Sequence, residues 1–445
     1  MPSRAHNHPP LKPIELDEPS QLDEVSLFQG LPMVRVPHDS AGPPPELLET
    51  AFLGFGGKEH DTDWDTLCIT ALKNRLPLRE HPMFESSMGP LRRYAGRVFV
   101  KVVDIPGKGR GLVAAVDILE TGRLFALERP LLICRGSLSS HLIANFTKLL
   151  DQGLTDQHKK EYYQLHNCKS KEPGMIEAIS IMRTNGFGID YPFDTESQRA
   201  VFDVISRANH SCVPNAYFEW DFKVFSGLLR PLVPIEKGEE ITISYTSLLV
   251  PASERKADLL RKYGFECTCP ACSLPPRLQK ESDQRRVALI DRINRGRALR
   301  ADTAVIHAGF DDSHIMESLN MCETEGLVYT RAEMMYWYAV WEIKLRAIRT
   351  GDWSRAEALA HRAIEETQKI GAIEFVVGLQ SLLLAKPGTR LNSQNIADIV
   401  NAIKSMALTE PKPDHASSSS RPSNSAVKDP EWSNLVIPVE YIARH

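Results

Sequence analysis

The sequence predicts a chain of mixed class, in which a mainly β domain with a helical insert precedes an all-α domain. Short β-branched runs recur at close spacing between residues 97 and 245, which is typical of a compact β domain. A stretch from about 276 to 405 has helical texture. Proline-rich and serine-rich segments lie near the two ends, outside both domains.

The composition limits the function classes. The 445 residues allow two or three domains, and 53 Lys and Arg against 57 Asp and Glu give a net charge of −4. This balance disfavours a dedicated nucleic-acid binder. We find no secretory signal in the first 30 residues and no apolar run of the ~20 residues that cross a bilayer. We therefore expect a soluble monomer in the nucleus, the cytoplasm or both, with no membrane partner.

Residues 1–95 are expected to form a partly ordered N-terminal extension. Proline-rich pieces such as His8-Pro9-Pro10 alternate there with charged residues, and the hydrophobic periodicity is patchy. Between Glu46 and Leu78 we expect a short helix or two.

The β domain is placed at residues 96–274. RVFVKVVDI (97–105) alternates valines and predicts a strand, and PGKGRGL (106–112) predicts a glycine-rich turn. Residues from about 138 to 205 form the helical insert, interrupted at NGFGID (185–190). Further strands are expected in LVAAVDI (112–118), RLFALERPLLIC (123–134), AYFEWDF (216–222), KVFSGLLRPL (223–232) and GEEITISY (238–245).

The helical domain is placed at 275–408, and a disordered tail at 409–445. Two helices flank Gly351-Asp352-Trp353, and Ala356, Ala360 and Ala363 keep one face of the second helix narrow. This pair resembles one tetratricopeptide hairpin. A solenoid needs about three such repeats, so a plain helical domain remains the alternative.

The eight cysteines fall into two groups. Four stand alone and are interpreted as small buried hydrophobes: Cys68, Cys134, Cys168 and Cys322. Cys267, Cys269 and Cys272 share one hexapeptide, but a tetrahedral zinc site requires four ligands. Cys212, about 55 residues upstream, is the natural fourth ligand. The alternative is a set of surface thiols without a metal.

The segment RANHSCVPNA (207–216) gathers polar side chains around Cys212. We expect Asn215 to hydrogen-bond to backbone where two segments cross, since Pro214 prevents regular pairing. Arg207 is interpreted as a surface or cofactor-edge charge. Glu239 and Glu240 resemble a catalytic carboxylate pair, but a solvated turn before a strand explains them better.

Four separated motifs resemble one family in order. GKGRG (107–111), NHSCVPN (209–215), GEEITISY (238–245) and YGFECTCPAC (263–272) together resemble the SET-domain protein-lysine methyltransferases. The resemblance is greatest to the branch that contains the SMYD proteins and covers residues 97–274, about 40% of the chain. Those proteins carry a MYND zinc finger. Here the corresponding region, about 135–180, holds only Cys168, so no such finger is expected.

The resemblance implies an S-adenosylmethionine site and a structural zinc. The backbone of 108–111 would hold the methionine end, Asn209 and His210 the adenine and the amine, and Phe265 would stack on the adenine. Tyr263 would wall the lysine channel, and Asn185 resembles an asparagine that contacts the cofactor. The cofactor residues implied are Lys108, Gly109, Arg110, Gly111, Asn185, Asn209, His210, Tyr263 and Phe265. The zinc ligands implied are Cys212, Cys267, Cys269 and Cys272.

Tyr245 is the catalytic residue that the resemblance implies, beside the transferred methyl group. A lysine amine has a reference pKa near 10.4, so keeping it neutral at pH 7 costs about 4.6 kcal/mol in water. A narrow apolar channel lowers that cost, and the Tyr245 hydroxyl orients the amine. His210 is not expected to be a general base, because the charge of the cofactor drives the reaction.

The function expected is protein-lysine N-methylation of histone or non-histone proteins. The alternative is a catalytically weak SET-domain scaffold that binds partners through its helical domain. A third reading is a nucleic-acid reader that uses the basic residues of 285–300, for which a solvated helix face is the simpler explanation.

Overall fold

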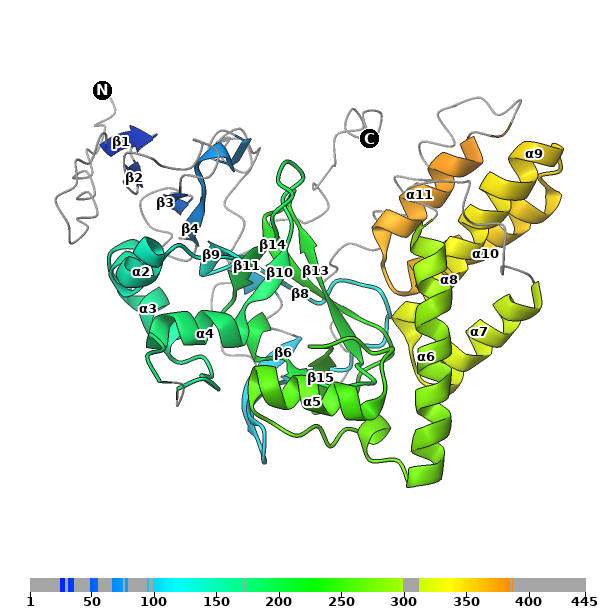
Figure 1. The fold of residues 1–445 in the computed structure, drawn as a ribbon, viewed down its shortest axis with the longest axis horizontal. Coiled ribbons are helices and arrows are strands. Elements are labelled where there is room, and N and C mark those ends of the chain that lie inside the picture. The colour runs from blue at the N-terminus through cyan, green and yellow to red at the C-terminus, as the bar shows by residue number, and fades with distance from the viewer. Residues whose placement is uncertain are drawn as a thin grey trace, which may run out of the picture.

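The computed structural model describes residues 25–28, 31–35, 49–54, 66–74, 77–78, 94–95, 99–170, 173–298, 312–384 and 386. These residues form a β-rich body, with one group of helices at its side, and a second, wholly helical body (Figure 1). The expected disordered tail at 409–445 and most of the extension at 1–95 lie outside the described residues.

The described strands form three sheets, with the orders β1-β2-β3-β4-β9-β11-β10, β12-β15-β7-β6 and β13-β14-β8-β5. This arrangement confirms the mainly β domain. The strands are β1 Val25–Phe28, β2 Leu31–Arg35, β3 Glu49–Gly54, β4 Thr66–Ala71, β5 Tyr94–Ala95, β6 Val100–Ile105, β7 Gly109–Ala114, β8 Ala126–Glu128, β9 Leu132–Arg135, β10 Phe187–Ile189, β11 Gln198–Val201, β12 Asn209–His210, β13 Ala216–Asp221, β14 Ser226–Pro231 and β15 Glu240–Ile243.

The second sheet aligns the motifs found in the sequence. β6 and β7 form a hairpin in which Ile105 pairs with Gly109, and β7 continues antiparallel to β15. β12 pairs in parallel with β15, with Asn209 opposite Thr242 and His210 opposite Ile243. The glycine-rich turn, the Asn-His pair and the strand that leads to Tyr245 therefore lie on adjacent strands.

The expectation of helices between Glu46 and Leu78 is wrong for most of the residues described there, although Leu72–Asn74 form a short 3-10 helix. β3 and β4 occupy it, and β4 is completely buried and parallel to β9. A six-residue apolar run does not distinguish a strand from a buried helix, and the strand that pairs with β4 comes 60 residues later in the chain. The extension thus supplies a central strand of the first sheet.

Three helices confirm the insert: α2 (Ser140–Gly153), α3 (Asp156–Tyr163) and α4 (Glu177–Asn185). Ser139 and Thr155 cap α2 and α3 by accepting hydrogen bonds from Leu142 and His158 backbone N–H groups. The helices share a buried cluster with β4 and β9. The last part of the expected insert is not helical, because β10 and β11 pair there as a hairpin.

The C-terminal body is helical, as predicted. Ala356, Ala360 and Ala363 are fully buried on α10 and lie in the same core cluster as residues of α8, which confirms the narrow helix face. Gly351 adopts φ 75° at the turn between them. The helices after β15 are α5 Ala252–Tyr263, α6 Pro276–Ala298, α7 Asp312–Thr324, α8 Val328–Trp341, α9 Ile348–Thr350, α10 Ser354–Lys369 and α11 Ile373–Leu384, with a π-helical segment η6 Glu342–Ala347 before α9.

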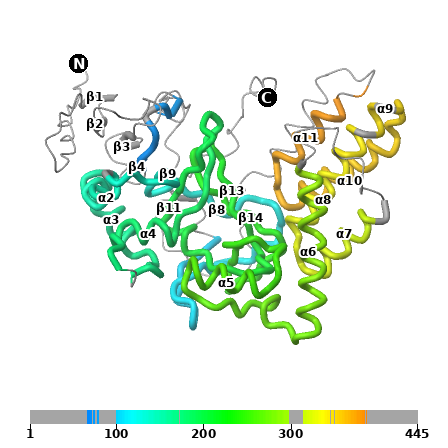
Figure 2. Tube along the Cα trace, viewed as in Figure 1, coloured from blue at the N-terminus to red at the C-terminus, as the bar shows by residue number. Residues whose placement is uncertain are grey.

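The helical body packs against the β-rich body beside α6 and the start of α11 (Figure 2). The Tyr217 hydroxyl of β13 donates to the Ile370 carbonyl at 2.9 Å. Gly122 and Gly371 pack so closely that a Cβ on Gly371 would lie 2.1 Å from the Gly122 carbonyl oxygen. No described helix is long and apolar enough to cross a membrane.

Candidate active site and four-cysteine cluster

The structure brings the four predicted cysteines together. The Sγ atoms of Cys212, Cys267, Cys269 and Cys272 all lie within 4.8 Å of one another, and those of Cys212 and Cys272 are 3.5 Å apart. Zn–S bonds of about 2.3 Å in a tetrahedron place sulfurs about 3.8 Å apart. The donor set and its size therefore suit one tetrahedral zinc ion.

Arg255 on α5 contacts this cluster and is fully buried. Its Nε lies 3.3 Å from Cys212 Sγ, and its Nη2 lies 3.9 Å from Cys272 Sγ. Four thiolates around one Zn²⁺ carry a net charge of −2, so a buried guanidinium compensates part of a buried negative charge. The sequence analysis missed Arg255. A signal for it existed, because Arg255 shares a helix face with the buried Ala252 and Leu259.

A second buried arginine connects the cluster to the helical body. Arg286 on α6 is also fully buried and pairs with Glu325 at 2.8 Å. Its Nη1 donates to the carbonyls of Leu248 at 2.7 Å and Cys212 at 3.4 Å. The segment that carries Cys212 is thereby held against α6 and the turn after α7.

The basic face expected at 285–300 is described as far as residue 298, where Arg286 is buried but Arg295 and Arg297 are 47% and 54% exposed. Arg285, Arg292 and Arg297 pair with Glu325, Glu317 and Glu333 at 2.7, 2.6 and 2.7 Å. These acids belong to α7, α8 and the turn between them. These arginines therefore join helices, and the expected solvated face is confirmed only in part.

Tyr245 follows β15 and is held at two points. Its hydroxyl donates to the Ala208 carbonyl at 2.6 Å, and its backbone N–H donates to His210 Nδ1 at 3.0 Å. Because Nδ1 accepts, the proton of the neutral ring lies on Nε2, which is 3.3 Å from Cys212 Sγ. Burial lowers the pKa of His210 to about 4. Both ring nitrogens are engaged, so His210 is a poor candidate for a general base.

Aromatic rings surround this tyrosine. The ring centroids of Tyr245 and Tyr263 are 4.8 Å apart, and those of His210 and Phe265 are 6.3 Å apart. α5 ends at Tyr263, and Gly264 adopts φ 74°, which turns the chain so that Phe265 faces His210. Burial raises the pKa of both Tyr245 and Tyr263. The two phenols therefore stay protonated near neutral pH.

Asn209 is connected to the glycine-rich hairpin through Glu240. Its Nδ2 donates to Glu240 Oε1 at 2.9 Å, and Lys108 Nζ lies 2.5 Å from Glu240 Oε2. Gly111 packs directly against this group, since a Cβ there would lie 2.6 Å from Asn209 Nδ2. Gly109 has φ 74° and no neighbour within 4 Å of a Cβ, so the hairpin backbone at Lys108–Arg110 is accessible.

Glu239 and Glu240 are bonded to other side chains and are not simply solvated, contrary to the expectation. Glu240 holds Asn209 and Lys108, while Glu239 accepts a hydrogen bond from Asn215 Nδ2 at 3.0 Å. Asn215 also donates to the Glu240 carbonyl at 2.8 Å and accepts from Thr242 N–H at 2.8 Å. The predicted bonding of Asn215 to backbone at a crossing is confirmed.

Three further expectations concern residues around this site. Asn185 uses its Nδ2 group within the insert, donating to the carbonyls of His166 at 2.7 Å and Ile181 at 2.8 Å. Arg207 is not a surface charge, because it is buried and paired with Asp203 at 2.9 Å. Of the four solitary cysteines, three are fully buried, but Cys168 is half-exposed and contacts Thr184 Oγ1 at 3.3 Å.

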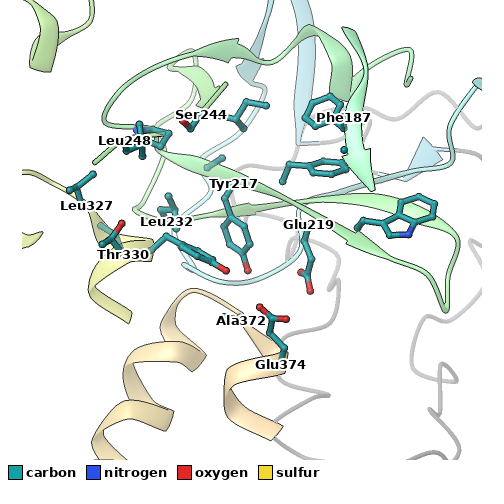
Figure 3. A pocket seen from close by; sticks show the side chains of 18 of the residues that line it. Phe187, Tyr217, Glu219, Leu232, Ser244, Leu248, Leu327, Thr330, Ala372 and Glu374 are labelled. Atoms are coloured by element: carbon teal, nitrogen blue, oxygen red, sulfur yellow. The ribbon is translucent and has the colours of Figure 1, made fainter. Parts of the chain in front are cut away.

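A cavity of about 600 Å³ adjoins the tyrosine site. Its walls come from β10, β13, the end of β15, the start of α8 and the start of α11 (Figure 3). Ile243 and Ser244 line it and directly precede Tyr245 in the chain. The cavity therefore lies between the β-rich and helical bodies and reaches the strand that carries Tyr245.

Residues 109–246 match the family model of the SET domain. The chain contains a SET domain. The match begins at β7, includes the helical insert and ends one residue after Tyr245. The three clustered cysteines at 267–272 follow the SET domain in the chain.

Curated relatives share this domain. Histone-lysine N-methyltransferase set5 of Schizosaccharomyces pombe is 32% identical over 223 residues, 48% of this chain and 65% of that protein. Histone-lysine N-methyltransferase SMYD3 of Homo sapiens is 38% identical over 101 residues, 22% of each chain. N-lysine methyltransferase SMYD2 of Gallus gallus is 28% identical over 158 residues, 33% of this chain and 34% of that protein. The matches thus span less than two thirds of these relatives.

A solved structure, the SET domain of LSMT bound to lysine and AdoHcy, is 13% identical to this chain. The match covers 70% of this chain and 86% of that one, with a TM-score of 0.25.

The SET domain here also has neighbours that the sequence analysis did not foresee. These are Arg255, Arg286 and the cavity side chains, which reach it from later parts of the chain.

Proposed function

We propose that this protein is an S-adenosylmethionine-dependent protein-lysine N-methyltransferase that acts on histone or non-histone proteins. The observation that carries the proposal is the site around Tyr245. Tyr245 is fixed by hydrogen bonds from its hydroxyl and its backbone N–H. It lies among aromatic rings beside the Asn209-His210 pair of a SET domain. The similarity to named lysine methyltransferases supports the same reaction.

The cofactor would bind where the hairpin, the Asn-His pair and Phe265 meet. When bound, S-adenosylmethionine supplies an electrophilic methyl group on a positively charged sulfonium. The groups present fit it: accessible backbone at Lys108–Arg110, opposite charges on Lys108 and Glu240 for the carboxylate and ammonium groups, and an aromatic ring for adenine. Asn209 and His210 would hold the adenosyl and amine parts. Asn185 is proposed here only through its backbone, since its Nδ2 group is already bonded.

Tyr245 would orient the lysine amine. Its hydroxyl proton is directed to the Ala208 carbonyl, so its oxygen lone pairs can accept a hydrogen bond from the amine. That bond would point the nitrogen lone pair along the line of attack. Tyr245 and Tyr263 also exclude water, which favours the neutral amine over the ammonium. Neither phenol is acidic enough to protonate the amine.

We also propose that Cys212, Cys267, Cys269 and Cys272 hold a structural zinc. The compact cluster of four sulfurs and the adjacent buried Arg255 support this assignment. His210 joins the cluster to Tyr245, because its ring contacts Cys212 on one side and the Tyr245 backbone on the other. The zinc would therefore fix the position of the tyrosine through one imidazole ring.

The helical body is proposed to be tetratricopeptide-like at α8 and α10, supported by the small buried face of α10. A scaffold without turnover is less well supported, because Tyr245 and its partners are all present. The monomeric state, and the nucleus or cytoplasm as location, stay predictions.

Transfer of labelled methyl groups tests the proposal. The full-length protein is incubated with methyl-labelled S-adenosylmethionine and a cell extract, and labelled lysines are identified by mass spectrometry. We expect methylated lysine in one or more proteins. Tight cofactor binding by calorimetry without any labelled protein would instead support the scaffold.

A further inference from the structure

The cavity beside Tyr245 has an unusual set of charges. It is lined by three acidic side chains, Asp190, Glu219 and Glu374, and none of the residues described as lining it is Lys, Arg or His. Five aromatic side chains also line it: Phe187, Tyr217, Phe218, Trp220 and Tyr329. Carboxylates combined with aromatic faces are the environment that proteins use to bind cations.

Two of the carboxylates face each other across the contact between the two bodies. Glu219 extends from β13, Glu374 from the start of α11, and Figure 3 shows their carboxylates pointing toward one another. Arg230 pairs with Glu219 at 2.8 Å but is itself buried and also donates to the Gly122 carbonyl. Arg230 is therefore shared between Glu219 and a backbone carbonyl.

The surroundings intensify this negative charge. Glu219 is largely enclosed, with 27% of its side chain exposed. Burial raises the pKa of Glu219, and the nearby Asp221 and Glu374 add to that rise. Tyr217 and Tyr329 stand beside the pair with ring centroids 5.2 Å apart, and both have a pKa raised by burial and by the same carboxylates. A positive charge placed here would relieve repulsion between fixed acids.

Residues that line the cavity directly precede Tyr245 in the chain. Ile243 and Ser244, the two residues before Tyr245, line the cavity, and so does Glu374 of the helical body. An extended substrate whose lysine reaches Tyr245 would therefore place a neighbouring side chain in the cavity. A volume of about 600 Å³ is in the range of pockets that enclose a ligand group.

We propose that this cavity binds a second, positively charged side chain of the protein substrate, close in sequence to the methylated lysine, and that Glu219 and Glu374 select it. Arginine fits better than lysine, because a planar guanidinium can stack on tyrosine and bond two carboxylate oxygens at once. This proposal rests on the proposed methyl transfer and specifies its substrates as basic segments.

The test uses a library of short peptides with one central lysine and random flanking residues. The full-length protein and labelled S-adenosylmethionine would methylate it, and the labelled peptides would be sequenced. We expect enrichment of arginine at one or two flanking positions. The best peptide should have a kcat/KM about tenfold above its Arg→Ala version, the factor that corresponds to ~1.4 kcal/mol.

Glu374→Lys reverses the charge at an exposed position and should leave folding intact. We expect it to remove the arginine preference, mainly through KM, and to favour acidic flanking residues. Glu365→Gln is the matched control, because Glu365 is an exposed glutamate on α10 that does not line the cavity. An unchanged preference in Glu374→Lys would overturn the proposal, as would enrichment of acidic or apolar residues alone in the wild-type protein.

Direct binding separates this proposal from the proposed reaction. Fluorescence anisotropy would compare the affinities of two labelled, glycine-rich peptides. Each contains one lysine, with arginine beside it in one peptide and alanine in the other. A preference for arginine that Glu374→Lys abolishes supports the cavity even if no methyl group is transferred. Methyl transfer without such a preference supports the reaction and overturns the cavity proposal.

Discussion

The Tyr245 hydroxyl and the Ala208 carbonyl form a hydrogen bond of 2.6 Å at the centre of the proposed site. This bond fixes the direction of the phenol and leaves its lone pairs for the amine. Tyr245→Phe removes the hydrogen bond to Ala208 and the proposed hydrogen bond to the amine, while the aromatic ring remains. We expect the rate of methyl transfer to fall about 10²-fold, in the range seen when one preorganised donor is lost.

The control for that substitution is Tyr191→Phe. Tyr191 is buried, and its hydroxyl has no hydrogen-bond partner among the described residues. Its removal should leave the rate within about twofold. Initial rates with the best peptide, and cofactor affinity by calorimetry, would be measured for both variants. Equal rates for Tyr245→Phe and wild type would remove Tyr245 from the proposed chemistry.

Cys269→Ser is expected to abolish the proposed zinc site. Three remaining thiolates hold zinc poorly, and structural zinc contributes about 10–16 kcal/mol of apparent binding free energy in peptides. Elemental analysis should show about one zinc per wild-type chain and a large loss in the variant, with a lower Tm. Cys168→Ser should keep the zinc, since Cys168 contacts Thr184 and not the cluster. Wild-type protein that is folded without zinc would contradict the assignment.

Arg255→Met should make the cluster release zinc faster. The substitution keeps much of the side-chain volume but removes the charge and the hydrogen bond to Cys212. We expect at least a tenfold faster transfer of zinc to a chromogenic chelator. Arg255→Lys should restore part of the retention through its charge. Arg261→Met on the same helix is the control, because Arg261 is 71% exposed and its partner among the described residues is Asp258.

Breaking the Arg286–Glu325 pair should destabilise the packing of α6 against the turn after α7. Both side chains are buried, and Arg286→Met removes one of three described partners of the Glu325 carboxylate. Arg285 at 2.7 Å and the Ser282 hydroxyl at 2.6 Å remain, so we expect a cost of about 3 kcal/mol, the lower end of the range for a broken buried pair. Urea denaturation would give the free energies of unfolding. The double variant Arg286→Met/Glu325→Leu should lose less unfolding free energy than the sum of the losses in the two single variants.

The exposed pair Arg277–Glu281 provides the comparison for that cycle. Its side chains are 90% and 42% exposed, so its coupling should be no more than about 0.5 kcal/mol. Additive effects in the Arg286–Glu325 cycle would show that these two side chains are not energetically coupled.

Local patterns in the sequence were enough for much of the SET domain. The alternating valines of β6 and the apolar run before Tyr245 signal strands because burial follows the strand period. Cys212 was paired with the later cysteines because a tetrahedral ion needs a fourth ligand. Asn215 followed from the neighbouring proline, which leaves backbone groups to be satisfied by a side chain.

The remaining features depend on contacts between distant segments. The sequence does not distinguish a buried arginine such as Arg286 from a solvated one, because only the fold places Glu325 next to it. Glu219 and Glu374 are far apart in sequence, so their proximity carries no local signal. Cys168 was expected to be buried on the basis of residue type alone, whereas the end of α5 covers it only in part.

The parallel pairing of β4 with β9 has a consequence for shortened forms of this protein. β9 contacts β11 on one side and β4 on the other, with Leu132, Ile133 and Cys134 opposite Leu67, Cys68 and Ile69. A chain that starts after β4 would turn this fully buried strand into an open edge. Open apolar edges recruit strands from other molecules. We therefore expect the segment around residue 68 to protect the SET domain from aggregation, although it precedes the recognisable family match by about 40 residues.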